Sequence, residues 1–177
     1  MSRATPAAAG DPPSLGDPRV RWPDGLAPET SPVFAHDELE ADMSAAAFWA
    51  CLIRATLWHH HYDNCKRLVI DGGGELLQLG TRFTWTTFGV RVTTTIDGYE
   101  PERYLSWSGT GLGSRGHHVW LLAPTPGGCR VVTEETQAGF AVRLLAPLLR
   151  RGLRRQHPRW LAGLARAATA AKEGTLS

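Results

Sequence analysis

The sequence of 177 residues contains no long apolar run, and its three cysteines form no CxxC pair. Its longest apolar stretches, such as residues 45–53, are far shorter than the roughly 20 residues that a membrane-spanning helix needs. The N-terminus also lacks the continuous apolar segment of a secretory signal, so we expect a cytoplasmic protein. Cys51, Cys65 and Cys129 are odd in number and widely spaced, which predicts buried thiols instead of a disulfide framework or a thiolate metal site.

Several motifs of common enzyme classes are missing as well. The glycine-rich stretch 72–75 has neither the GxGxxG pattern nor a Lys-Ser/Thr pair, so it is interpreted as a loop and not as a phosphate site. No serine lies in a G-x-S-x-G elbow, which removes support for a hydrolase triad. His59, His60 and His61 are consecutive, and helical geometry turns their side chains about 100° apart, so they cannot all ligate one ion. The sequence therefore predicts no bound metal and no cofactor.

The charge is distributed unevenly along the chain, although the formal net charge is only +2. Residues 1–42 hold eight acidic residues and three arginines, whereas residues 141–172 hold seven arginines, one lysine and no acidic residue. Such a cationic ridge would attract an acidic partner at long range, for example an acidic carrier protein or an anionic membrane surface. A solvated helix face, balanced by the acidic N-terminal segment, is the alternative. The ridge consists of Arg150, Arg151, Arg154 and Arg155, flanked by Arg143 and Arg159.

Nucleic acid is not an expected partner of this ridge. Aromatic residues are not interleaved with the arginines, and no recognition-helix pattern is present. A regulatory interaction protein that uses the ridge remains a third functional hypothesis, and it predicts association that weakens as salt increases.

The composition indicates one domain with an N-terminal arm. Apolar residues make up 42% of the chain and include seven tryptophans, which is enough to fill the core of a single domain. Residues 1–32 are rich in proline and poor in bulky apolar side chains, so we predict a flexible arm that Trp22 holds against the domain. The domain itself is predicted to cover residues 33–172.

The periodicity of apolar residues changes twice along this domain. A short strand is expected over 33–39, followed by an N-cap at Asp42 or Ser44 and one or two short helices up to about Tyr62. From about residue 68 to 138, apolar residues alternate with polar ones between glycine-rich turns, which predicts six further antiparallel strands. The predicted fold class is therefore α+β, with about seven strands.

Beyond Gly139 the apolar residues follow the spacing of a helix of about 30 residues. This helix is long enough to cross the whole sheet. Pro147 and Pro158 interrupt its hydrogen bonding, so we expect a kink near His157, or two helical pieces.

The order of these elements resembles the helix-grip fold of the START and polyketide cyclase-like superfamily, called SRPBCC. The likeness covers about residues 33–170 and implies a curved antiparallel sheet wrapped around the C-terminal helix. It also implies a cavity for lipids, sterols, polyketides or hormones, and a minority of members are cyclases, dehydratases or oxygenase components. Stretches similar to the superfamily are Phe48-Trp49 followed by Trp58, Leu79-Gly80-x-x-Phe83-x-Trp85, Glu100-Pro101 before Leu105-x-Trp107, His118-x-Trp120, and Thr133-Glu134-Glu135 with Gly139.

One register of the predicted strands directs a broad aromatic surface toward the C-terminal helix. Such a surface suits a flat or elongated apolar ligand, although the same aromatic residues could simply fill the core. A slip by one residue would instead present Arg82, Thr84, Thr86, Arg115, His117 and Glu134. The predicted ligand-binding residues are Trp58, Tyr62, Phe83, Trp85, Leu105, Trp107, Trp120, Thr133, Leu149 and Leu153.

His118 and Glu135 lie on the same predicted face and are the candidate catalytic residues. A histidine with a carboxylate partner can move protons at an enolisable carbon, as a polyketide cyclase or dehydratase requires. A purely structural hydrogen bond between the two is the alternative. Arg82 or Arg115 could meet an anionic head group of the ligand or could remain solvated. The first functional hypothesis is thus a carrier of an apolar or aromatic small molecule, and the second is a cyclase or dehydratase.

Overall fold

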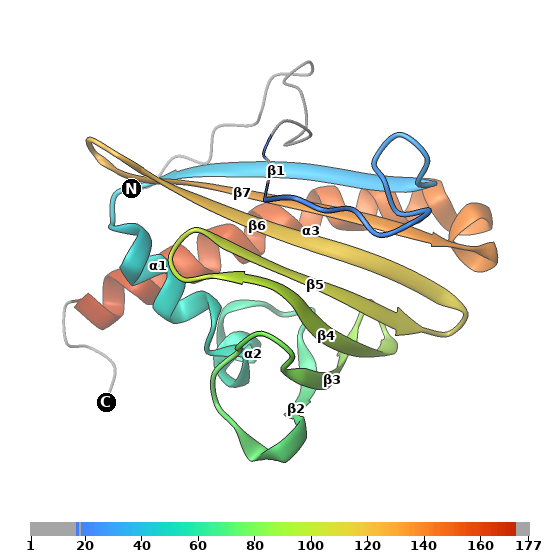
Figure 1. Cartoon of the computed structure of the whole chain (residues 1–177), viewed down its shortest axis with the longest axis horizontal. Coiled ribbons are helices and arrows are strands. Elements are labelled where there is room, and N and C mark those ends of the chain that lie inside the picture. Colours follow the sequence, from blue (N-terminus) through green and yellow to red (C-terminus); the bar gives the residue numbers. More distant parts are fainter. Residues whose placement is uncertain (1–16, 18, 173–177) are drawn as a thin grey trace.

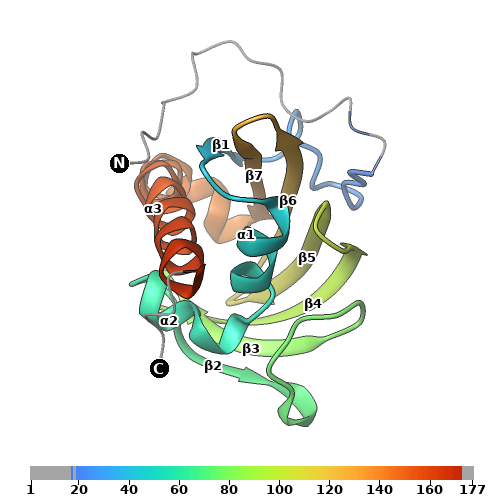
Figure 2. The same cartoon turned by 90° about the vertical axis from the view of Figure 1, so that its left-hand side faces the viewer.

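The computed structural model describes Asp17 and residues 19–172 of the chain. One antiparallel sheet of seven strands, in the order β1-β7-β6-β5-β4-β3-β2, curves around a long C-terminal helix (Figure 1, Figure 2). The predicted α+β helix-grip class is confirmed. The strands are β1 (Val33–Ala41), β2 (Lys66–Ile70), β3 (Arg82–Thr87), β4 (Val90–Glu100), β5 (Tyr104–Gly111), β6 (Ser114–Thr125) and β7 (Gly128–Gly139). The helices are α1 (Ala45–Leu52), α2 (Trp58–His61) and α3 (Phe140–Lys172), with single 3-10 turns η2 (Ala55–Leu57) and η3 (Asp71–Gly73).

The register of the central strands fixes which side chains face α3. Trp107 lies opposite His118, and His118 lies opposite Glu135. Directly opposed residues of antiparallel strands project from the same face of the sheet, so these three side chains share the concave face. The register predicted from the alternation is therefore correct. His117 and Glu134 consequently project from the convex face.

Two-residue turns join β3 to β4 and β5 to β6, and each places a bulky apolar residue in the left-handed region of backbone space. Phe88 has φ 48° and precedes Gly89 at 75°, while Leu112 has φ 47° and precedes Gly113 at 70°. Two successive positive φ angles produce a tight turn whose twist matches that of the flanking strands. Because β4 pairs with both β3 and β5, the two turns lie side by side at one end of the sheet.

The short helices close the opposite end of the concave face. Ser44 caps α1 as predicted, since its Oγ accepts a hydrogen bond from the backbone N–H of Ala47 at 3.2 Å. The indole Nε1 of Trp58 donates to the carbonyl of Leu52 at 2.9 Å, which ties the start of α2 to the end of α1. The ring of Trp58 lies 4.9 Å from that of Trp160 on α3, at the centre of the aromatic core.

Helix α3 runs without a break through Pro147 and Pro158, so the alternative of two helical pieces is wrong. Packing of an apolar stripe against the sheet offsets the hydrogen bond that each proline removes. In the part of the chain that the structure describes, no helix combines the length and the hydropathy that crossing a membrane would require. The buried residues of α3 include Val142, Ala146, Leu153, His157, Trp160 and Leu164.

Residues 19–32 run along the convex face, on the side of the sheet away from α3 (Figure 2). Trp22 packs there against Tyr104, Val119 and Leu121, and its ring lies 5.4 Å from that of His117. Residues 1–16 of the predicted arm lie outside the described residues, and the domain boundary at residue 32 stays a prediction.

Candidate functional site

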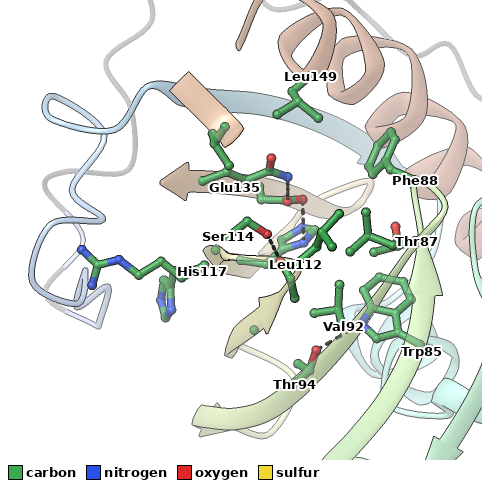
Figure 3. Close-up of a pocket in the computed structure, with 18 of the residues that line it drawn as sticks. Trp85, Thr87, Phe88, Val92, Thr94, Leu112, Ser114, His117, Glu135 and Leu149 are labelled. Atoms are coloured by element: carbon green, nitrogen blue, oxygen red, sulfur yellow. Dashed lines mark hydrogen bonds and ion pairs between the residues drawn. The ribbon is translucent and has the colours of Figure 1, made fainter. Parts of the chain in front are cut away.

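A cavity of about 160 Å³ lies between the concave face of the sheet, the two neighbouring hairpin turns and the first half of α3 (Figure 3). Trp85, Val92 and Trp107 form its sheet wall, and Leu145 and Leu149 contribute from α3. Most of this wall is apolar, which is the composition of pockets that bind organic molecules.

The predicted ligand-binding residues divide into two groups in the structure. Tyr62, Trp85, Trp107 and Leu149 line the cavity. The other six are buried away from the cavity wall, and two of them pack against Trp160 of α3, whose ring lies 4.9 Å from that of Trp58 and 5.1 Å from that of Trp120. The predicted ligand-binding residues that are buried but do not line the cavity are Trp58, Phe83, Leu105, Trp120, Thr133 and Leu153.

Sequence reasoning missed the contribution of the hairpin turns. Phe88 and Leu112 line the cavity from these turns, together with Thr87 and Val90 at the adjoining strand ends. Phe88 lies close to α3, because a Cβ atom added at Gly152 would lie 3.1 Å from Cε1 of its ring. The pairing of an apolar residue with glycine at each turn was a signal, but only the assembled sheet brings both turns to α3.

Three titratable side chains from different elements meet at the cavity. Glu135 of β7 places its Oε2 at 3.3 Å from Nδ1 of His118 on β6 and at 3.1 Å from Nε2 of His157 on α3. The two imidazole rings stack with their centroids 5.0 Å apart. His118 and Glu135 line the cavity, and His157 lies behind them and is buried.

Further polar groups hold the outer atoms of this cluster. Nε2 of His118 lies 2.7 Å from Oγ1 of Thr133. The amide nitrogen of Gln137 donates to Oε1 of Glu135 at 2.6 Å, and Oδ2 of Asp37 lies 3.4 Å from Nδ1 of His157. Thr133 and Gln137 are thus hydrogen-bonded to His118 and Glu135, and Asp37 forms an ion pair with His157.

The surroundings shift the pKa of all three groups. Burial lowers the pKa of His118 to about 3, against the opposing effect of the Glu135 carboxylate. Burial alone would raise the pKa of Glu135, but the hydrogen bond from His157 and the proximity of His118 lower it to about 2. Burial alone would lower the pKa of His157, but Asp37 and Glu135 raise it to about 9. At neutral pH the cluster therefore presents a neutral imidazole, a carboxylate and an imidazolium.

The sequence placed His118 and Glu135 together but did not identify His157 or Asp37. The pairing of β6 with β7 explains the success, since neighbouring strands carry the two residues at opposed positions. A signal for His157 existed, because this polar residue lies between Leu153 and Trp160 in the apolar stripe of α3. Asp37 approaches only because β1 closes the sheet beside β7.

Other polar candidates lie away from this cluster. His117 points toward the N-terminal segment (Figure 3), and its Nδ1 lies 3.0 Å from Oγ of Ser108 on the convex face. Arg82 is exposed and lies 3.6 Å from Asp71, whereas Arg115 borders the cavity. Of the predicted ridge, Arg151, Arg154 and Arg155 are exposed, and Arg150 donates to the carbonyl of Pro32 at 2.6 Å.

Comparison with known proteins gives one family and many structures of this fold. The sequence model of the family described as "Polyketide cyclase / dehydrase and lipid transport" matches residues 36–169. Comparison with the curated proteins finds no significant match.

Three solved structures illustrate the structural likeness. The hypothetical protein jhp0584 from Helicobacter pylori is 24% identical, with a TM-score of 0.76 over 84% of this chain and 95% of that chain. The two-domain ARO/CYC protein StfQ of the steffimycin pathway is 19% identical, with a TM-score of 0.62 over 80% of this chain and 52% of that one. Norcoclaurine synthase from Thalictrum flavum is 18% identical, with a TM-score of 0.59 over 76% of this chain and 91% of that one. At these identities the likeness shows the fold alone.

Proposed function

We propose that this chain, which belongs to the polyketide cyclase/dehydrase and lipid transport family, binds a polyketide-like or lipid-like small molecule between the sheet and α3. The observation that carries the proposal is an apolar cavity whose wall contains His118 and Glu135, with His157 buried directly behind them. Apolar walls supply affinity for a hydrophobic body, and a few fixed polar groups set its orientation. A cytoplasmic location stays a prediction.

The size of the cavity limits which part of a ligand it encloses. A cavity of about 150 Å³ holds one benzene ring, and the cavity here has about 160 Å³. One aromatic ring or a short acyl segment therefore fits inside, and a longer ligand must extend through the mouth between the hairpin turns and α3. Leu112 and Leu145 support such a path, because these large apolar side chains line the cavity and are also exposed.

Filling the cavity tests the proposal directly. Leu149→Trp adds an indole to the cavity wall, whereas the matched variant Leu144→Trp adds the same group to an exposed position on α3. Binding of the neutral fluorophore N-phenyl-1-naphthylamine would be titrated to both variants and to the unmodified protein. We expect at least about tenfold weaker binding in Leu149→Trp only, which corresponds to about 1.4 kcal/mol. Equal affinities in all three proteins would refute a binding site in this cavity.

A second candidate function is a cyclase or dehydratase, and the charges of the cluster favour it. The neutral imidazole of His118 and the carboxylate of Glu135 are both proton acceptors at the cavity wall. Either group would take a proton from an enolisable carbon of the bound molecule as the base and, once protonated, would return that proton to the product as the acid. Turnover of a poly-β-keto substrate would be compared between the unmodified protein, His118→Ala and Glu135→Gln. Unchanged turnover in both variants would exclude this mechanism.

An acidic carrier protein is the proposed source of a tethered substrate. Arg151, Arg154 and Arg155 form an exposed cationic surface on α3, and Arg150 lies beside them. Long-range attraction to an acidic partner weakens as salt screens it. Binding of an acyl carrier protein, followed by fluorescence anisotropy from low to high salt, would test this partner. Affinity that does not depend on ionic strength would contradict it.

A further inference from the structure

Three electron-pair donors of the polar cluster face one small volume. One ligand atom from each of His118, Glu135 and His157 can be chosen so that all three lie within 4.8 Å of one another. The donors that meet Glu135 Oε2 are Nδ1 of His118 at 3.3 Å and Nε2 of His157 at 3.1 Å. Ligands 2.0–2.1 Å from a tetrahedral zinc ion lie about 3.3 Å apart. Two of the three separations therefore already suit a common metal ion.

The groups behind these donors have the arrangement of an outer ligand shell. Histidine ligands usually give their second ring N–H to an oxygen acceptor, which orients the ring and keeps the other nitrogen free for the metal. In a metal-bound state, Thr133 Oγ1 would accept from Nε2 of His118, which lies 2.7 Å away, and Asp37 Oδ2 lies 3.4 Å from Nδ1 of His157. Gln137 donates to the second oxygen of Glu135.

A divalent ion can also take the place of the positive charge that His157 carries in this cluster. Asp37 and Glu135 bring two carboxylates to a region where the side chains of His118 and His157 are only 4% and 1% exposed. Without a metal ion, the raised pKa of His157 keeps its ring protonated, so one positive charge compensates part of the charge of the two carboxylates. Metal binding would release this proton, and the divalent ion would neutralise the resulting charge of −2.

We propose that Nδ1 of His118, Oε2 of Glu135 and Nε2 of His157 bind a divalent transition-metal ion of the zinc type. Two imidazoles and one carboxylate form the ligand set of catalytic zinc sites, in which a water or substrate oxygen takes the remaining position. That position faces the cavity, because His118 and Glu135 line it.

This proposal departs from the expectation of no metal, because the third ligand comes from α3 and not from a recognisable motif. It does not depend on the apolar ligand, but it excludes the acid–base role of His118, since the metal would occupy the lone pair that the role requires. His59, His60 and His61, by contrast, contribute to no candidate metal group among the described residues.

The test compares Zn²⁺ binding between matched variants of the full chain. The metal-stripped protein would be titrated with Zn²⁺ by calorimetry, and Co²⁺ absorption would report tetrahedral coordination. The two ligand variants are His157→Ala and Glu135→Gln. The second replacement leaves the shape of the side chain nearly unchanged. The control replaces His59, His60 and His61 by alanine and leaves the cluster intact. Circular dichroism confirms that each variant is folded.

We expect one Zn²⁺ per chain in the unmodified protein and in the triple-histidine control. Affinity should fall by at least about 100-fold in each ligand variant, and by about 10- to 100-fold in the outer-shell variant Asp37→Asn. Absence of stoichiometric Zn²⁺ binding, or binding that survives His157→Ala and disappears in the triple-histidine control, would overturn the proposal.

Discussion

Replacing Gly163 by alanine should destabilise the protein, although alanine is the better helix former. Gly163 lies inside α3, where it passes directly beside α2. A Cβ atom at this position would lie 2.1 Å from the backbone carbonyl oxygen of His61. Non-bonded heavy atoms prefer separations of about 3.5–4.0 Å, so one of the two helices must move.

Two opposing contributions determine the size of this effect. Gly→Ala inside a helix is worth about 1 kcal/mol in favour of alanine. Overpacking costs about 1–3 kcal/mol, and the cost here should lie at the upper end, about 3 kcal/mol, because the obstacle is backbone that cannot rotate away. Less the gain in helix propensity, we expect the free energy of unfolding to fall by about 2 kcal/mol in Gly163→Ala.

Gly152 in the same helix provides the matched control. Its added Cβ would meet Cε1 of Phe88 at 3.1 Å, and a partly buried side chain can shift by a few tenths of an ångström. Gly152→Ala should therefore leave stability unchanged or raise it by up to about 1 kcal/mol.

Urea unfolding followed by circular dichroism would measure both variants. For a chain of this length, about 2 kcal/mol corresponds to a melting temperature roughly 4–8 °C lower. A Gly163→Ala protein as stable as the unmodified one, or as Gly152→Ala, would refute the close contact between α2 and α3.

Three further predictions concern the core, one ion pair and the thiols. Trp58→Ala should lower the free energy of unfolding by about 3–5 kcal/mol, because this fully buried ring contacts four other aromatic rings; a small loss in urea unfolding would contradict it. The hydrogen bond to buried Glu134 raises the pKa of His36 despite the opposing effect of burial. Its stabilisation should therefore be complete below pH about 6.5 and disappear as pH rises through the raised value, so that the stability difference from His36→Gln shrinks between pH 6 and pH 9. Burial raises the pKa of Cys65 to about 12, so this thiol should react with Ellman's reagent at pH 8 only after unfolding; rapid reaction in the native protein, assigned by mass spectrometry, would contradict its burial.

The architecture could be predicted from local patterns because each element carries its own signal. Alternating residues such as Phe83 and Trp85 indicate strands, and Ser44 marks the start of α1 through its capping side chain. The opposed positions of His118 and Glu135 followed from the same alternation, once β6 and β7 were taken as neighbours.

The division between core and cavity could not be predicted in this way. Alternation assigns a residue to a face but does not say how far the opposite layer fills the space above it. Trp160 packs against Trp58 and Trp120, and the hollow part of the concave face lies nearer the hairpin turns. His157 was not predicted as a site residue for a related reason: the partners of a polar residue in an apolar helical stripe come from other elements, which the local pattern does not show.

The left-handed backbone conformation of Phe88 and Leu112 lowers the stability of the protein but places apolar side chains at the entrance of the cavity. An L-amino acid with a large side chain loses about 1–2 kcal/mol in this conformation, and asparagine or glycine tolerates it better. Both turns nevertheless carry a large apolar side chain, which lines the cavity and would contact an apolar molecule as it enters. Replacing Leu112 with asparagine should therefore raise the free energy of unfolding and slow the entry of an apolar ligand into the cavity.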